Sequence, residues 1–338
     1  MDAVPKLFVD AVIRAFGKPG LDAIAKVADP MWSSAGKLGI QSRRYFNLYI
    51  GKVDGKFALG FREIDLYTEG LPSVRTIRPW EIKLIKQEDF RIRYVLGLIG
   101  DLRGFATKDC QSADLLLVDE KAFLTTLSQL ARQVDWILQW GELELRQNYP
   151  KYDPITVNLG DEDFAQVSRM VLKSFCNRAN FPSTTIPYVG SESEGFLKAC
   201  IYNNPRVHSI KLEKNWPSSI LPDIQHFLRK REGRYVRMPD NFRVESDFLT
   251  QLVDFWRNNG DLECELYYEG SAKEPPQELM MNKVPNFEAY FYRKHDSKKS
   301  ISFYDARKDR ISFGFLKCSC GVSDGRCPWN TYPDLHKL

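Results

Sequence analysis

Residues 5–16 carry apolar side chains around most of a helical circumference. Pro5 suits the first position of a helix and no helix breaker follows before Phe16, so the sequence predicts a helix of about three turns. At 100° per residue, the polar side chains fall within roughly 80° and the apolar ones spread over roughly 240°, whereas one core-facing stripe needs only about 100°. The additional apolar side chains predict that the helix packs against two neighbours, the second of which is either another part of this chain or another protein.

Further apolar positions follow a break at residues 17–20. Leu21, Ile24, Val27 and Trp32 are spaced as expected for a second short helix followed by a bend. The first forty residues are therefore expected to form a small helical module.

Alternating apolar and polar positions predict strands in two other parts of the chain. Residues 44–64 alternate on both sides of Asp54-Gly55, a strong turn signal, and this pattern predicts a β-hairpin. Residues 81–99 alternate as expected for a further strand. Three stretches near the other end predict an antiparallel meander: 287–295, 299–306 and 309–318.

From about residue 113, short apolar runs alternate with helical stretches. The later runs begin at residues 155, 184, 208, 235 and 263, at intervals of 29, 24, 27 and 28 residues. A strand-plus-helix unit of that length cannot bury its own apolar face and must stack on similar units, as in leucine-rich-repeat solenoids. The asparagine ladder and strict leucine spacing are missing, so we expect a degenerate form; an unrepeated α/β sheet is the alternative.

Composition and charge narrow the class of protein. The chain has 338 residues, 43% of them hydrophobic and 27% charged, which is typical of a globular protein of two or three domains. The net charge of +4 is too small to favour nucleic acid or an anionic membrane as a partner. No apolar run is long enough for a membrane span, and no signal peptide is recognisable. The seven scattered cysteines favour the reducing cytoplasm or nucleus.

The apolar positions of the first 32 residues resemble the F-box, the three-helix module that docks onto the Skp1 adaptor of cullin-RING ubiquitin ligases. The F-box pattern begins Leu-Pro and ends Val-x-x-x-Trp. This sequence departs from it at Gly20, where an acidic residue is usual, and at Asp29-Pro30, which are expected to interrupt the last helix. Such a degenerate box is also similar to F-box-like families expanded in nematodes. The resemblance implies adaptor contact, or support of it, by Val4, Pro5, Phe8, Val12, Ile13, Phe16, Leu21, Val27 and Trp32.

The patterns and the resemblance together predict an α+β/α/β fold in four parts. These are an F-box-like helical module at 1–40, a β-rich linker region with the hairpin at 41–112, a domain of degenerate leucine-rich-repeat-like β/α units at 113–272, and a small C-terminal antiparallel β-meander with a cysteine-containing tail at 273–338. The β/α units would form the domain that recognises substrates.

By this resemblance, the chain is a substrate-recognition subunit of a Skp1-cullin-F-box ubiquitin ligase. Its expected partners are a Skp1-like adaptor with its cullin complex and an unidentified protein substrate, with neither nucleic acid nor membrane. The alternative is a stand-alone interaction or scaffold protein whose N-terminal helices only cap the repeat domain.

Sequence motifs of catalysis are absent. The chain has no phosphate-binding glycine loop, no His-Glu-x-x-His and no Gly-x-Ser-x-Gly, and it contains only four histidines. We therefore expect that it is not an enzyme and needs no cofactor.

Three further clusters have a structural and a functional interpretation. Cys318, Cys320, Cys327 and His336 could in function hold a tetrahedral zinc ion. Because Cys-x-Cys is not the usual spacing of a zinc knuckle, we expect ordinary thiols without metal. The basic residues Arg229, Lys230, Arg231, Arg234 and Arg237 lie at a predicted helix end, where the helix dipole favours them without a ligand. The aromatic residues are either hot spots of a binding face or, as we expect for most, core residues: Trp136, Trp140, Trp216, Trp256, Tyr267 and Tyr268.

Overall fold

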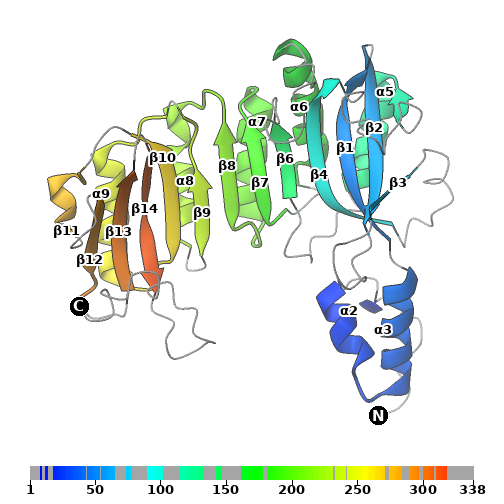
Figure 1. The fold of residues 1–338 in the computed structure, drawn as a ribbon, viewed down its shortest axis with the longest axis horizontal. Coiled ribbons are helices and arrows are strands. Elements are labelled where there is room, and N and C mark those ends of the chain that lie inside the picture. Colours follow the sequence, from blue (N-terminus) through cyan, green and yellow to red (C-terminus); the bar gives the residue numbers. More distant parts are fainter. Residues whose placement is uncertain are drawn as a thin grey trace. The chain divides into compact units, whose positions relative to one another are not determined.

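The computed structural model folds into two compact units, Met1–Val207 and His208–Leu338 (Figure 1). The structure describes residues 8–9, 12–13, 18–42, 44–53, 55–64, 74–77, 90–101, 115–131, 142–146, 161–177, 181–230, 233–240, 242–270, 274–283, 289–296, 300–307 and 310–317.

The first described elements are helical. Residues 8–9 and 12–13 are in helical conformation, and α2 (Lys18–Ala25) and α3 (Pro30–Ser42) follow. Asp29 caps α3, because its Oδ1 accepts hydrogen bonds from the backbone N–H groups of Met31 at 2.9 Å and Trp32 at 3.2 Å. Asp29-Pro30 therefore begins a helix, where the sequence pattern predicts that the pair interrupts one. The hydroxyl of Ser33 donates to the Ala25 carbonyl at 2.8 Å and ties the two helices together.

The first unit contains a mixed sheet. Strand β1 (Arg44–Val53) forms an antiparallel hairpin with β2 (Lys56–Ile64), and Gly55 at the turn has φ +75°, which favours glycine. On the other side of β1, the strands β4 (Phe90–Asp101), β6 (Glu142–Arg146) and β7 (Ser183–Pro187) continue the sheet in parallel. Strands β3 (Val74–Ile77) and β5 (Leu116–Val118) both pair antiparallel with β2.

Helices of the first unit pack in a row beside this sheet (Figure 1). Helix α5 (Glu120–Leu130) contacts β2, with Phe123 stacked on Phe57 at 4.6 Å between ring centroids. Helix α6 (Asp161–Phe175) contacts β1, β4 and its two neighbouring helices, and α7 (Ser191–Lys198) contacts β7 and continues into a π-helical turn, Ala199–Asn203.

The second unit changes from parallel to antiparallel pairing at one strand. Strands β8 (Ser209–Glu213), β9 (Arg234–Arg237) and β10 (Cys264–Glu269) are parallel. Strand β10 then pairs antiparallel with β14 (Arg310–Lys317), which continues through β13 (Ser300–Arg307), β12 (Tyr290–Lys294) and β11 (Asn282–Lys283). Its helices are α8 (Leu221–Leu228) and α9 (Ser246–Asn259), with short 3-10 turns at Ser218–Ile220 and Gln277–Leu279.

Burial along β8, β9 and β10 alternates from residue to residue. One face of these strands is therefore in the core and the other is partly open to solvent. Helix α9 covers the buried face near β14, where its fully buried Trp256 stacks on Phe315 at 5.4 Å and donates from Nε1 to the Ser300 hydroxyl at 2.9 Å.

The described strands and helices differ from the predicted ones in pairing and grouping. The run at residue 115 forms a strand, but β5 pairs antiparallel with β2 and so is not a unit of a parallel repeat. The predicted meander strands pair with β10 through β14, so they belong to the sheet of the preceding β/α units. The boundary between the two compact units, after Val207, falls inside residues 113–272, which the sequence predicts to be a single domain of β/α units. The predicted strand at 155 and the first part of 81–99 lie outside the described residues.

Candidate functional site

The helical module has a small core of its own. Val9, Ile13 and Leu21 are buried against one another, and Ile24 and Trp32 pack against them as partly buried side chains. Of the three buried residues, Ile13 and Leu21 are among the positions that resemble the F-box. They stabilise the module from inside, and their side chains are not available for contact with a partner.

Glycines on α3 allow its close packing. An added Cβ at Gly36 would lie 2.7 Å from the backbone nitrogen of Ala25, and one at Gly39 would lie 2.8 Å from Cγ2 of Ile13. Both distances are shorter than real Cβ atoms show, so α3 approaches its neighbours more closely than a larger residue would permit.

Four large apolar side chains of this module are exposed. Phe8 is 55% exposed, Val27 46%, Met31 36% and Leu38 64%. Only three other large apolar side chains of the described residues are as exposed, and they are scattered over the rest of the chain: Leu117, Tyr202 and Met280. Four of the seven exposed large apolar side chains of the described residues therefore belong to this one helical module.

The exposed residues only partly coincide with those predicted from the sequence. Phe8 and Val27 are exposed, and Val12 and Trp32 are half-buried, with the Phe8 ring edge-on to Trp32 at 6.4 Å between centroids. Sequence reasoning missed Met31 and Leu38, although seven residues apart on one helix places them on the same face. Val4, Pro5 and Phe16 lie outside the described residues.

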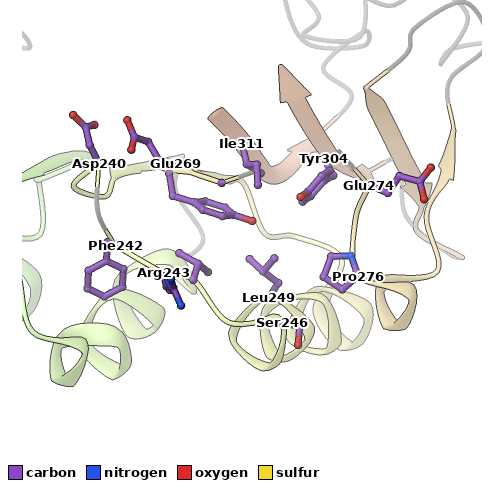
Figure 2. Close-up of a pocket in the computed structure, with 13 residues that line it drawn as sticks. Asp240, Phe242, Arg243, Ser246, Leu249, Glu269, Glu274, Pro276, Tyr304 and Ile311 are labelled. Carbon is purple, nitrogen blue, oxygen red and sulfur yellow. The ribbon is translucent and has the colours of Figure 1, made fainter. Parts of the chain in front are cut away.

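A second candidate is an open cavity of about 760 Å³ in the second unit (Figure 2). It lies where β9 and β10 end, so that the segments following these two parallel strands form its walls together with α9, β13 and β14. The carboxyl ends of parallel strands are a common place for ligand sites in α/β proteins. The lining residues are Asp240, Phe242, Arg243, Val244, Ser246, Leu249, Tyr268, Glu269, Gly270, Glu274, Pro276, Tyr304 and Ile311.

The floor of the cavity is apolar and neutral. Phe242, Leu249 and Ile311 are buried, as are Tyr268 and Tyr304, whose hydroxyls are hydrogen-bonded to each other. Burial raises the pKa of Tyr268 and of Tyr304, so both phenols are uncharged near neutral pH.

Charged groups occupy the rim. Asp240, Arg243 and Glu274 are exposed and Glu269 is half-buried. Asp240 has a cationic neighbour outside the cavity lining, Arg237, at 3.7 Å. Glu269, the last residue of β10, is the cross-strand partner of Arg310 on β14, on the open face of the sheet.

The predicted basic cluster is not one continuous patch. Arg234 is buried over the ring of Phe227, and Arg229 lies over Phe255. Arg237 lies over Tyr267 at 5.3 Å, on the opposite side from Arg310, which approaches the same ring at 6.0 Å. The residue Arg231 is outside the described part of the chain.

The aromatic candidates are mostly core residues. Trp216, Trp256 and Tyr268 are buried, whereas Tyr267 is partly exposed on the open face of β10. Trp136 and Trp140 are outside the described residues, as are all four zinc candidates, Cys318, Cys320, Cys327 and His336. Within the described ranges, no cluster of His, Cys, Asp or Glu is arranged to hold a metal ion.

Comparisons with known proteins assign no family. No family model matches the chain, and no curated protein matches it. The chain is similar, over 92% of its length and 92% of theirs, to two crystal forms of MycE methyltransferase from the mycinamycin biosynthetic pathway in complex with Mg and SAH. The identities are 14% and 12%, and the TM-scores are 0.21 and 0.20.

These matches correct one prediction from the sequence. The missing catalytic motifs predict that the chain is not an enzyme, but the solved structures to which it is similar are enzymes, so that exclusion is wrong. TM-scores near 0.2 assign neither their fold nor their activity to this chain.

In the described segments, no helix has the length and apolar character needed to cross a membrane.

Proposed function

We propose that the helical module, residues 1–42, docks the chain onto a Skp1-like adaptor and that the chain thereby brings a protein substrate to a cullin-RING ubiquitin ligase. The observation that carries the proposal is the exposure of Phe8, Val27, Met31 and Leu38 on a module that has a small buried core of its own. The resemblance of the sequence to the F-box selects a Skp1-like adaptor as the partner that would cover these side chains. The adaptor and its cullin would be met in the cytoplasm or nucleus.

The physical role of such a subunit is to raise the local concentration of a substrate near the ubiquitin-carrying enzyme. Docking needs an apolar surface of defined shape, because burial of apolar area provides most of the free energy of association. The close packing at Gly36 and the cap at Asp29 hold α2 and α3 in a fixed relation and so present such a surface.

Adaptor binding tests the proposal directly. Purified wild-type chain is titrated with recombinant Skp1, in parallel with the double variant Phe8→Glu/Met31→Glu. Both side chains are on the surface, so the variant is expected to fold and to bind at least about tenfold more weakly, because each buried apolar side chain contributes roughly 1.5–3 kcal/mol. Leu117→Glu is the matched control, since Leu117 is 45% exposed on β5, outside the module, and the substitution should not change the affinity.

Two results contradict the proposal. One is the absence of Skp1 binding by the wild-type chain, and the other is equal binding by the wild type and Phe8→Glu/Met31→Glu. Deleting residues 1–42 tests the alternative of a stand-alone scaffold protein. If the helices only cap the following domain, the shortened chain unfolds and the wild type does not bind Skp1.

A further inference from the structure

The cavity at the ends of β9 and β10 lies between a helix and the buried face of a sheet. Figure 2 shows Ile311 and Tyr304, from β14 and β13, on one side, and Leu249 and Ser246, from α9, on the other. Its volume of about 760 Å³ is within the range of sites for small ligands. The charge and polarity of the lining then decide which kind of molecule fits.

The charges at the rim offset one another. Asp240 lies 3.7 Å from Arg237, which is outside the lining. The other two exposed charges of the lining have opposite signs, because Arg243 is a cation and Glu274 an anion. Exposed charges are also hydrated and screened by salt, so neither attracts an ion strongly. The rim therefore favours neither a cationic nor an anionic ligand.

Glu269 adds no negative charge to the inside of the cavity. Burial alternates along β10, so the Glu269 side chain lies on the opposite face of the sheet from the buried Tyr268. On that open face it is the cross-strand partner of Arg310. Counting Arg237 and Arg310 with Arg243, three guanidinium groups balance the three carboxylates at the cavity.

The floor disfavours ions. Its side chains are buried and uncharged near neutral pH: Phe242, Leu249, Ile311 and the phenols Tyr268 and Tyr304, whose pKa values burial raises. An ionised group would lose hydration there without gaining an ion-pair partner, whereas an apolar group gains by leaving water. An extended peptide carries an N–H and a C=O group at every residue, and a floor of this composition would leave most of them without partners.

We propose that this cavity binds a small, uncharged and mainly apolar molecule. The lining offers apolar and aromatic area beside two neutral hydroxyls and carries no excess charge, so the ligand that loses least on leaving water is a neutral one. Ligand binding at this position is independent of adaptor docking, because no residue of the helical module lines the cavity. Each of the two proposals can therefore fail while the other stands.

Fluorescence titration of the purified full chain, without adaptor, tests the proposal. The probe is N-phenylnaphthylamine, an uncharged dye that brightens in apolar surroundings. Its matched control is anilinonaphthalenesulfonate, which has the same rings and a sulfonate group. The neutral dye is expected to bind saturably and at least about tenfold more tightly than the sulfonate, because the sulfonate must give up hydration. Moderate sodium chloride should not weaken binding of the neutral dye, since no ion pair forms.

Displacement by ligands of similar size separates charge from shape. Phenethyl alcohol, phenethylamine and phenylacetate carry the same ring with a neutral, a positive and a negative group. Phenethyl alcohol is expected to displace the neutral dye at a concentration at least about tenfold lower than either ion. Arg243→Gln and Glu274→Gln should each change the affinity for the dye by less than about twofold, because both charges are at the surface.

Blocking the mouth checks the location. Ser246 is exposed at the start of α9 and lines the cavity, so Ser246→Trp should abolish binding of the neutral dye. Asp247→Trp is the matched control, because Asp247 is the next exposed residue of α9 and lies outside the lining. Phe8→Glu/Met31→Glu should bind the dye as the wild type does, which excludes the exposed side chains of the helical module as its site.

A small neutral ligand is ruled out by any of the following results. They are the absence of saturable dye binding, equal binding of the sulfonate dye, displacement by either ion at the concentration of phenethyl alcohol, and unchanged binding by Ser246→Trp. Displacement by acetyl-Gly-Phe-Gly-amide at that same concentration would assign the cavity to a peptide side chain and would overturn the proposal as well.

Discussion

Replacing Gly36 by alanine is expected to destabilise the helical module, although alanine normally favours a helix. Gly36 lies within α3, and its added Cβ would be 2.7 Å from the backbone nitrogen of Ala25 and 3.1 Å from the Cα of the same residue. Ordinary van der Waals contact begins at 3.4 Å, so α2 and α3 would have to separate by about 0.7 Å. Because the obstacle is backbone, no rotamer change of a side chain can relieve it.

Two opposing terms determine the size of the effect. In an exposed helix, Gly→Ala gains about 1 kcal/mol from propensity. Overpacking in a tight contact typically costs about 1–3 kcal/mol, and the upper half of that range applies where only backbone can move. The net expectation is that Gly36→Ala lowers the local free energy of unfolding by about 1–2 kcal/mol, and that the presentation of Phe8 and Met31 is disturbed with it.

Native-state hydrogen exchange is the assay, because it reports on each helix separately. Peptides covering α2 and α3 should exchange roughly fivefold to thirtyfold faster in Gly36→Ala than in the wild type. Gly195, inside α7, is the matched control: an added Cβ there meets no atom within 4 Å, so Gly195→Ala should slow exchange in its own helix. Unchanged or slower exchange of α2 and α3 in Gly36→Ala would refute the close packing of the two helices.

Three further predictions follow from single contacts. Trp256→Phe removes the indole hydrogen bond to Ser300 and should lower the free energy of unfolding of the second unit by about 1–3 kcal/mol, with a double-mutant cycle against Ser300→Ala isolating the bond. Asp29→Ala removes the cap of α3 and should cost about 1 kcal/mol, measured as faster exchange of its first turn. Burial raises the pKa of the Cys264 thiol above its ordinary 9.0, so the folded state keeps the thiol neutral. Below pH 9 the thiol is neutral in both states and the free energy of unfolding is unaffected. Above pH 9 the unfolded state loses the proton first, so the free energy of unfolding falls by up to about 1.4 kcal/mol per pH unit. Denaturant unfolding between about pH 8 and 10 should show a steeper decline in the wild type than in Cys264→Ala.

The sequence predicts elements that depend on neighbouring residues, such as turns and single strands, better than it predicts which strands pair. Asp54-Gly55 between two alternating arms specifies a hairpin, and β1 and β2 pair about that turn. In the later β/α units, apolar alternation locates β8 and β10, because their buried and half-exposed residues alternate as the sequence does. Pairing partners are different: Leu116–Val118 has the pattern of the first strand of a repeat, but it pairs with β2, about sixty residues earlier. A three-residue apolar run contains no information about which strand it joins.

The candidate sites were predictable to different degrees. Phe8 follows from the apolar excess of the first helix, whereas the burial of Ile13 and the exposure of Leu38 depend on how closely α3 approaches, which glycine spacing alone does not reveal. The cavity has no sequence signature. Its lining comes from residues as far apart as Asp240 and Ile311, brought together by antiparallel pairing of β10 with β14.

The exposure of the module bears on the choice between docking and capping. A helical cap exists to cover apolar surface, and its own apolar residues are covered in return, so a cap should leave few of them exposed. Phe8 and Leu38 are both more than half exposed, and Val27 is nearly so. Packing against the described residues of this chain therefore leaves these side chains exposed, which favours the proposed docking over the capping alternative. By the same reasoning, binding of Skp1 should protect Phe8, Val27 and Met31 from solvent together, and protection of the core residues Val9 and Leu21 should change little.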